Sequence, residues 1–189
     1  MPKMIIKKNA DAAIVNLIKS GGIGVIPTDT IYGIVGSALL ENTVQKIYKL
    51  RKRNPRKPMI VLIGSMRDLG MCGIKPNLVT KKQIEKLWPG KVSVILPCVS
   101  KKFTYLHRGT KTVAFRFPAN VRLRRLLKKT GPLVAPSANT EGDLPARTIP
   151  EAFAYFGNSV DFYLDGGRIS SRPSMLVRIK RDGRVEAVR

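Results

Sequence analysis

The chain alternates short apolar runs with segments of helical periodicity, and this alternation constrains its fold more than any other feature. Apolar runs of about four to eight residues are typical of strands buried on both faces, whereas apolar residues three or four apart are typical of a half-buried helix. The predicted strands cover residues 23–27, 59–63, 92–96, 113–117, 133–135, 159–164, 175–179 and 185–188. The predicted helices cover residues 11–19, 43–50, 81–87 and 121–129, and a further helix starts at Thr148. This order predicts an α/β fold with helices flanking a sheet and polar loops at the strand ends.

The length and composition fit one globular domain, which we expect to span residues 1–189. Of the 189 residues 43% are hydrophobic, enough to enclose one core. The links around residues 54–56 and 136–137 are too short to divide domains, and residues 140–147 are expected to form a mobile flap. No run approaches the roughly 18–20 apolar residues of a membrane span, and the N-terminal segment lacks the apolar run of a signal peptide. We therefore expect no membrane partner and a cytoplasmic location.

Side chains that bind metals or act as nucleophiles are few. Cys72 and Cys98 stand without a Cys-x-x-Cys pair, and His107 is the single histidine. We therefore expect no disulfide framework, no metal-ligating residues, two buried thiols and a histidine with no catalytic role. The phosphate loop of common ATPases, the dinucleotide fingerprint, the serine nucleophile elbow and the His-Glu-x-x-His motif do not occur in the sequence. The common ATPase, dehydrogenase, hydrolase and zinc-protease classes are thereby excluded.

The chain is strongly basic. It has 35 Lys and Arg residues against 12 Asp and Glu, a net charge of +23, and no acidic residue occurs between Glu85 and Glu141. Charge of one sign over so much chain attracts polyanions, either a nucleotide or a nucleic-acid backbone. A basic bias shared by a whole proteome is the alternative explanation, so charge by itself names no function.

Polar side chains follow the predicted strand at residues 23–27. The segment reads Pro27-Thr28-Asp29-Thr30-Ile31-Tyr32-Gly33, which places hydroxyl groups at a strand exit, where they would face a cleft. Thr and Asp also favour turns through local hydrogen bonds, so a purely structural turn is the alternative.

A basic loop lies between the helix that ends at Leu50 and the strand that begins at Met59. It runs Lys49-Leu50-Arg51-Lys52-Arg53-Asn54-Pro55-Arg56-Lys57. Guanidinium and ammonium groups match phosphate oxygens and neutralise the charge that develops in phosphoryl transfer, so this loop suits ATP or RNA equally. A solvated loop without a ligand is the alternative.

A third polar segment, Pro136-Ser137-Ala138-Asn139, follows the strand at residues 133–135. Side chains two apart on extended backbone point the same way, so Ser137 and Asn139 can share one ligand. Neither is a strong base, which makes them positioning groups. A capped turn is the alternative.

Six segments, taken in order, resemble the YrdC/YciO family. They are Pro27–Gly33, Arg51–Arg53 with Lys57-Pro58, Trp88-Pro89-Gly90, Thr112–Pro118, Ala135–Asn139 and Arg172-Pro173-Ser174. The resemblance runs from about Gly21 to the C-terminus. It implies a three-layer α/β fold around a twisted, mostly parallel or mixed sheet. The length is expected to place the chain with the short, single-domain form.

Members that this chain resembles make threonylcarbamoyl-AMP and pyrophosphate from L-threonine, bicarbonate and ATP, usually with Mg²⁺. The product serves the threonylcarbamoylation of adenosine 37 in transfer RNA through a downstream threonylcarbamoyl transferase complex. The resemblance therefore implies a nucleotidyltransferase, an L-threonylcarbamoyladenylate synthase, that uses Mg²⁺ with ATP.

The resemblance also implies a role for individual residues. Arg51 and Arg53 are the implied catalytic residues, because cations stabilise charge on the phosphates. The implied ATP-binding residues are Arg53, Lys57, Thr112, Ser137, Asn139 and Arg189. The implied threonine-binding residues are Thr30, Arg116 and Ser174, with Arg116 suited to pair the carboxylate. Because Arg53 and Asn139 are expected in ligand-binding loops, alanine at either position is expected to abolish synthesis and leave folding intact.

Three departures from the family pattern are visible. The Lys-x-Arg signature appears as Arg51-Lys52-Arg53, which replaces a compact ammonium by a planar guanidinium, and we expect altered activity. A position that is often histidine in long-form relatives falls within Val61-Leu62-Ile63, so one threonine contact is expected to be absent. The family's Ser-Thr-Val-Val strand appears as Ser174-Met175-Leu176-Val177.

Two other functions stay open at this point. One is an RNA-binding module of the same fold that holds tRNA or double-stranded RNA without synthesis, which the charge of +23 fits equally well. The other is a YciO-like relative of unassigned activity. The presence of Ser137, Asn139 and the cations of the basic loop makes this second function the less favoured one. Threonine-dependent release of pyrophosphate from ATP separates the synthase from the RNA-binding module.

Overall fold

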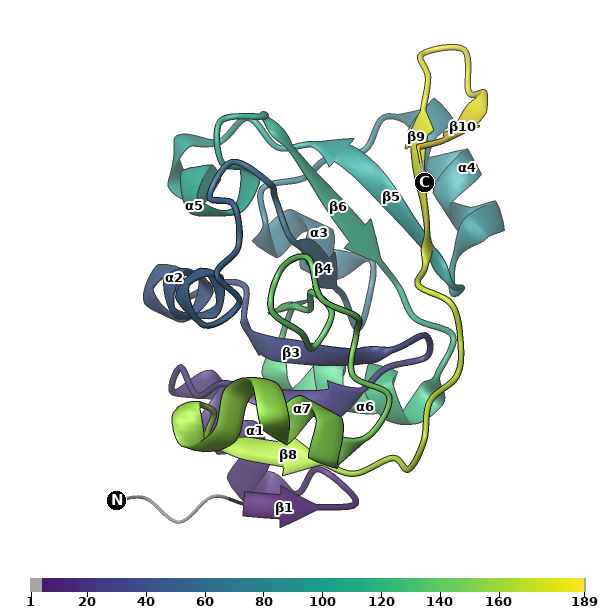
Figure 1. Cartoon of the computed structure of the whole chain (residues 1–189). Helices are drawn as coiled ribbons and strands as arrows, with labels where there is room; N and C mark the ends of the chain where they lie inside the picture. The colour runs from purple at the N-terminus through teal and green to yellow at the C-terminus, as the bar shows by residue number, and fades with distance from the viewer. Residues whose placement is uncertain (1–4, 189) are drawn as a thin grey trace.

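The computed structural model describes residues 5–188, which form one mixed sheet of ten strands (Figure 1). The strands are β1 (Ile5–Lys7), β2 (Gly24–Pro27), β3 (Tyr32–Ser37), β4 (Ile60–Leu62), β5 (Val92–Pro97), β6 (Thr112–Arg116), β7 (Leu133–Val134), β8 (Phe162–Leu164), β9 (Met175–Ile179) and β10 (Val185–Ala187). Their order across the sheet is β1-β8-β2-β3-β7-β4-β6-β5-β9-β10. The pairs β1/β8, β8/β2, β4/β6 and β5/β9 are parallel, and the other pairs are antiparallel.

Helices follow the strands in the predicted alternation. Over residues 5–188 they are α1 (Ala12–Lys19), α2 (Glu41–Leu50), α3 (Arg67–Met71), α4 (Leu78–Leu87), α5 (Thr104–His107), α6 (Val121–Thr130) and α7 (Ile149–Phe156). Asn120 and Thr148 cap α6 and α7 by accepting hydrogen bonds from backbone N–H groups at 3.0 and 3.4 Å. Short polar side chains of this kind satisfy the free N–H groups of a first turn, which confirms the helix starts predicted from the sequence.

Successive residues of the central strands enter two different hydrophobic clusters. One cluster contains Val25, Ile34, Val61 and Val134. The other contains their chain neighbours Ile26, Val35, Leu62 and Leu133. Because neighbouring side chains of a strand point to opposite faces, the sheet is buried on both sides. This arrangement explains why the strands read as continuous apolar runs.

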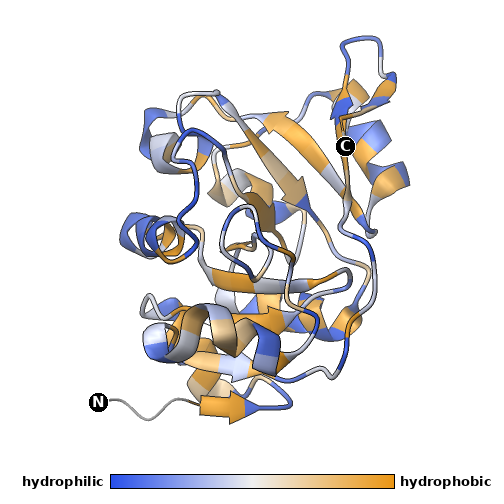
Figure 2. Cartoon of the chain, viewed as in Figure 1, coloured by the Kyte–Doolittle hydropathy of each residue, from blue (hydrophilic) through white to orange (hydrophobic). Residues whose placement is uncertain are grey.

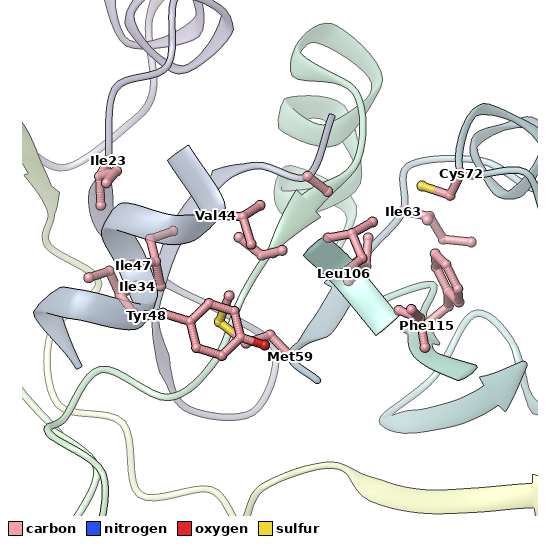
Figure 3. Packing of buried hydrophobic residues seen from close by; sticks show 14 of the residues in the cluster. Ile23, Ile34, Val44, Ile47, Tyr48, Met59, Ile63, Cys72, Leu106 and Phe115 are labelled. Atoms are coloured by element: carbon pink, nitrogen blue, oxygen red, sulfur yellow. The ribbon is translucent and has the colours of Figure 1, made fainter. Parts of the chain in front are cut away.

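Helices cover both faces of the sheet and give the predicted three-layer α/β fold. Buried residues of α1 and α6 share the second cluster, whereas those of α2, α5 and α7 belong to the first. Figure 1 shows α7 in front of β8, with α1 and α6 on the far side of the sheet. In Figure 2 the strands are mainly hydrophobic and the outer turns of α2 are hydrophilic. Figure 3 shows Val44, Ile47 and Tyr48 of α2 facing Ile34 and Met59.

Four of the strands and α-helices named above were not predicted from the sequence. They are β1, β3, α3 and α5. The segment β3 is buried along its whole length, yet Gly33 and Gly36 interrupt its apolar pattern. A Cβ atom at Gly36 would lie 2.4 Å from Cγ2 of Thr43 in α2, so glycine allows the close approach of the helix to the sheet. The other three elements span five residues or fewer, too short for a periodic signal.

The isolated thiols and the histidine lie in the interior. Cys72 and Cys98 are buried, as expected, and His107 is buried with Nδ1 accepting a hydrogen bond from the Gly109 N–H at 3.1 Å. Within residues 5–188 no helix is both long and apolar enough to span a bilayer. The assignment of residues 1–189 to one domain stays a prediction.

The buried thiol and phenols predict loss of stability at alkaline pH. Burial raises the pKa of Cys72 and of Tyr105 and Tyr163 to about 12, from 9.0 for a free thiol and 10.0 for a free phenol. Above about pH 9 the unfolded chain releases these protons and the folded chain retains them, so the free energy of unfolding falls as pH rises. Urea titrations between about pH 8 and about pH 11 measure this decrease.

Replacement of Cys72 by alanine supplies the control for the alkaline titration. It removes one raised pKa, so the free energy of unfolding of the variant should fall less steeply with pH than that of the parent. Parallel slopes would show that the Cys72 thiol contributes nothing to the pH dependence.

Candidate active site

One cavity of ≈ 240 Å³ lies where the β2–β3 turn, the end of β6, the loop after α2 and the loop after β7 meet. Its lining includes seven residues that the sequence analysis assigned to ligands: Thr30, Arg51, Arg53, Arg116, Ser137, Asn139 and Ser174. The fold thus brings the phosphate-binding and threonine-binding candidates into one space.

Two of the assigned residues lie outside this lining, and a third lies outside the described residues. Thr112 begins β6 whereas Arg116 ends it, so strand geometry separates them by about 13 Å, and the Thr112 hydroxyl donates to Thr110 Oγ1 at 3.2 Å. Thr112 therefore lies outside this cavity lining, and its assignment to the nucleotide stays a prediction. Lys57 lies outside the lining, with Nζ 3.0 Å from Glu141 Oε1. Arg189 lies outside the described residues.

Arg51 is held inside the protein by the loop after β7. The chain leaves α2 through Lys52, whose φ of 48° is left-handed, and this turn directs Arg51 and Arg53 toward the cavity. The Arg51 side chain donates from Nε to the Asn139 carbonyl at 3.0 Å, and from Nη2 to Ser137 Oγ and Asn139 Oδ1, both at 3.2 Å. Ser137 and Asn139 do share a partner, as their spacing predicts, and that partner is a protein cation.

Burial makes Arg51 an unusual cation. The residue is 2% exposed, and desolvation, with a smaller contribution from nearby Arg53, lowers its pKa to about 10. The guanidinium therefore stays charged at neutral pH. Among the described residues Nη1 of Arg51 has no hydrogen-bond partner, and Arg51 lines the cavity. A buried, unpaired N–H of a cation is costly unless a ligand accepts it, so Arg51 is suited to bind an anion.

Arg116 provides a second buried cation, on the β2–β3 side of the cavity. Its Nη1 donates to Thr30 Oγ1 at 3.2 Å, and its Nη2 lies 3.2 Å from Asp29 Oδ1. Burial lowers the pKa of Arg116, and Asp29 opposes that shift. Nε of Arg116 has no hydrogen-bond partner within residues 5–188. This donor, next to the Thr30 hydroxyl, suits a carboxylate.

The β2–β3 turn is both a structural turn and a wall of the cavity. Thr28 Oγ1 donates to the Ile31 carbonyl at 2.7 Å and accepts from the Thr30 N–H at 3.2 Å. Nη2 of Arg116 also donates to Thr28 Oγ1 at 3.4 Å. Thr28 and Asp29 have no predicted ligand role, and their contacts with Arg116 depend on the tertiary arrangement of the sheet, which brings the β2–β3 turn to the end of β6.

A brace outside the cavity fixes the basic loop, and sequence reasoning did not find it. Arg108, at the end of α5, stacks 4.0 Å from the Tyr48 ring and donates to the Pro55 carbonyl at 2.7 Å. The Tyr48 hydroxyl donates to the Lys57 carbonyl at 2.9 Å. Arg53 donates from Nε to the same carbonyl at 3.1 Å. These bonds hold the loop backbone, so the direction of Arg53 is set before any ligand enters.

Ser174 reaches the cavity from the segment before β9. Its hydroxyl is 2.9 Å from the hydroxyl of Ser93 in β5, and both residues are buried. The parallel pairing of β5 with β9 keeps the two hydroxyls together.

The cavity itself offers little to a metal ion. Over residues 5–188 no group of three His, Cys, Asp or Glu side chains is placed to hold one. Asp143 is the single carboxylate in the lining, and Asp29, in the β2–β3 turn outside the lining, is paired with Arg116. Mg²⁺ prefers several oxygen ligands and keeps waters, so the residues here suit an ion that arrives on ligand phosphates rather than a protein-held ion.

Fold and cavity together define an α/β protein with a cationic pocket for two anionic groups. The model of the Sua5/YciO/YrdC family, described as telomere recombination, matches residues 16–189. The chain therefore belongs to this family, which confirms the resemblance inferred from its motifs.

Named relatives agree with this assignment. The threonylcarbamoyl-AMP synthase of Idiomarina loihiensis is 34% identical over 147 residues, which are 76% of this chain and 79% of the relative. The threonylcarbamoyl-AMP synthase of Pyrococcus abyssi is 28% identical over 151 residues, 79% of this chain and 44% of the relative. The crystal structure of P. abyssi Sua5 complexed with L-threonine has a TM-score of 0.86 at 24% identity, covering 99% of this chain and 57% of that chain. The chain thus spans about half the length of the Pyrococcus protein, and this structural likeness shows the fold.

The contacts of Asn139 revise the expectation that its replacement leaves folding intact. Asn139 is 4% exposed and accepts from Arg51, and its Nδ2 donates to the carbonyls of Thr140 and Asp143 at 2.7 and 2.9 Å. Asn139→Ala leaves an arginine N–H and two carbonyls without partners, which should lower the free energy of unfolding by about 2–3 kcal/mol. Urea unfolding of the purified variant measures this loss.

A matched control is Asn77→Ala, which removes an exposed asparagine that caps α4 through one bond to the Thr80 N–H at 2.8 Å. Loss of a helix cap costs about 1 kcal/mol. Equal losses in the two variants would contradict the role of Asn139 in holding Arg51.

Proposed function

We propose that this protein makes threonylcarbamoyl-AMP and pyrophosphate from L-threonine, bicarbonate and ATP. The observation that carries the proposal is that two buried arginines, Arg51 and Arg116, line one cavity. Each has an N–H group without a protein partner within residues 5–188. Membership of the Sua5/YciO/YrdC family and relatives named threonylcarbamoyl-AMP synthase support it.

The Arg116 side of the cavity is proposed to bind L-threonine. A guanidinium that already contacts one carboxylate, Asp29, can take a second through its free Nε. Thr30 and Ser174 supply hydroxyl groups in the same lining, suited to the polar groups of the amino acid. This arrangement would hold the amine of threonine inside the cavity, where it adds to bicarbonate-derived carbon dioxide to form a carbamate.

The Arg51 side is proposed to bind ATP. Arg51 and Arg53 would neutralise the phosphates as a carbamate oxygen bonds to the α-phosphorus and the bond to the β-phosphate oxygen breaks, releasing pyrophosphate. The reaction needs fixed positive charge more than a base, and the cavity lining provides no histidine. Ser137 and Asn139 act by orienting Arg51. Mg²⁺ would enter as the complex with ATP, held by phosphate oxygens.

The product would be consumed by a downstream threonylcarbamoyl transferase complex that modifies adenosine 37 of transfer RNA. Because ATP and transfer RNA are cytoplasmic, we place the reaction in the cytoplasm. Thr112 and Lys57 lie outside the cavity lining and stay candidates for contact with the nucleotide. Lys57 lies at the edge of the proposed site through Glu141, which also contacts Arg53.

A second candidate function is an RNA-binding module of the same fold. The observation that favours it is α6, which presents exposed Arg122, Arg125, Lys128 and Lys129 and contains no acidic residue. Such a row of cations suits a phosphate backbone, either of transfer RNA or of double-stranded RNA. A filter-binding titration with RNA at increasing salt tests it directly.

Replacement of Arg53 tests the proposed synthase. In Arg53→Ala we expect threonine-dependent pyrophosphate release from ATP in bicarbonate buffer to fall by about a hundredfold or more, because one positioned charge at the phosphates is lost. The measurement is a coupled pyrophosphate assay, with mass detection of the adenylate product.

The matched control is Arg56→Ala, an exposed arginine of the same loop that lies outside the cavity lining. It removes equal charge and should keep near-parental activity. If the parent protein binds RNA but releases no pyrophosphate in response to threonine, the synthase is wrong and the RNA-binding module is favoured.

A further inference from the structure

The carboxylate of Glu141 lies on the cations of the basic loop. Its Oε1 is 3.0 Å from Lys57 Nζ and 3.9 Å from Arg53 Nη1, and its Oε2 accepts a hydrogen bond from the Asn54 N–H. That backbone bond, with Lys57 and Arg53, lowers the pKa of Glu141, so the carboxylate is charged at neutral pH. One anionic group thus contacts a lysine, an arginine and a backbone N–H, the same kinds of donor that bind a phosphate.

Glu141 ends a long stretch without acidic residues and reaches this position from the other side of the cavity. It is the first acidic residue after Glu85, and it is 84 residues from Lys57 along the chain. Its neighbours Asn139 and Asp143 line the cavity, as Arg53 does. The carboxylate therefore lies at the edge of the proposed ATP site.

We infer that Glu141 is an internal competitor of the ATP triphosphate: it neutralises Arg53 and Lys57 in the free protein and gives way to the β- and γ-phosphates. This inference rests on the proposed function. It makes Glu141 a residue that sets the affinity for nucleoside triphosphates, because an incoming phosphate must first displace a carboxylate from these cations.

The surrounding bonds allow the Glu141 side chain to move while its backbone stays in place. The Glu141 N–H donates to the Arg51 carbonyl at 2.8 Å, and Asn139 Nδ2 donates to the Asp143 carbonyl at 2.9 Å. These bonds are independent of the Glu141 carboxylate. The inference needs no movement of the predicted flap at residues 140–147. It needs the Glu141 side chain alone to move away from Lys57, whose side chain is 62% exposed.

The test is Glu141→Gln, which keeps the size of the side chain and removes its charge. We expect the Kd for ATP, measured by calorimetry without threonine, to fall by about two- to fivefold, the range that exposed ion pairs are worth. The Kd for AMP, which lacks the β- and γ-phosphates, should not change. In turnover, the KM for ATP should fall while the KM for threonine and kcat stay near the parental values.

Glu186→Gln is the matched control. Glu186 pairs with Lys180 at 3.4 Å in the β9–β10 hairpin, outside the cavity lining. The variant therefore loses one negative charge, as Glu141→Gln does, but frees neither Arg53 nor Lys57. A double-mutant cycle with Lys57→Ala completes the design: when Lys57 is absent, Glu141→Gln should improve ATP binding less.

The outcomes separate this inference from the proposed function. Suppose that the parent protein binds ATP and that the Glu141→Gln variant binds ATP equally well or more weakly, or gains as much affinity for AMP as for ATP. The competitor role is then wrong, and the proposed synthase stands. A parent protein that binds no ATP would overturn the proposed function, and this inference with it.

Discussion

The site depends on the burial of the Arg51 guanidinium. Removing such a group from water costs several kcal/mol, and the cost is tolerable only where the protein supplies hydrogen-bond acceptors in the right geometry. Ser137 Oγ and both oxygens of Asn139 are those acceptors. Because Arg51 follows α2 and the acceptors follow β7, one buried cation ties a helix end to a strand exit.

The acceptors are in turn fixed by the sheet. The chain beyond β7 continues to pair with β3, through the Ile34 N–H to the Pro136 carbonyl at 3.0 Å and the Ala138 N–H to the Tyr32 carbonyl at 2.9 Å. Ser137 and Asn139 then point to one side while Ala138 is fully buried. The pairing with β3 and the bend at Ala138 and Asn139 thus determine which side chains meet Arg51.

The sequence was most informative where local pattern and tertiary structure agree. Continuous apolar runs predicted the central strands because both faces of the sheet are covered, and Asn120 and Thr148 predicted helix starts because capping is local. It was least informative where a role depends on residues far apart in the chain. Thr112 shares β6 with Arg116, yet strand length separates them, and the Arg108 brace on Tyr48 has no local signal. Asn139 was correctly placed by its motif, but its structural role appears only beside Arg51.

The two buried arginines of the cavity differ in their surroundings, and this difference suits them to different ligands. Arg116 already contacts Asp29, so this pair carries little net charge, and its free Nε would offer the proposed amino-acid carboxylate a directed hydrogen bond rather than an uncompensated positive charge. Arg51 contacts neutral acceptors through Nε and Nη2, so its positive charge remains to be balanced by a ligand. A triphosphate brings more negative charge than a carboxylate and gains most from the uncompensated cation. The net charge of +23 attracts polyanions in general, whereas the proposed distinction between a triphosphate and an amino acid is made by which buried arginine has an acidic neighbour.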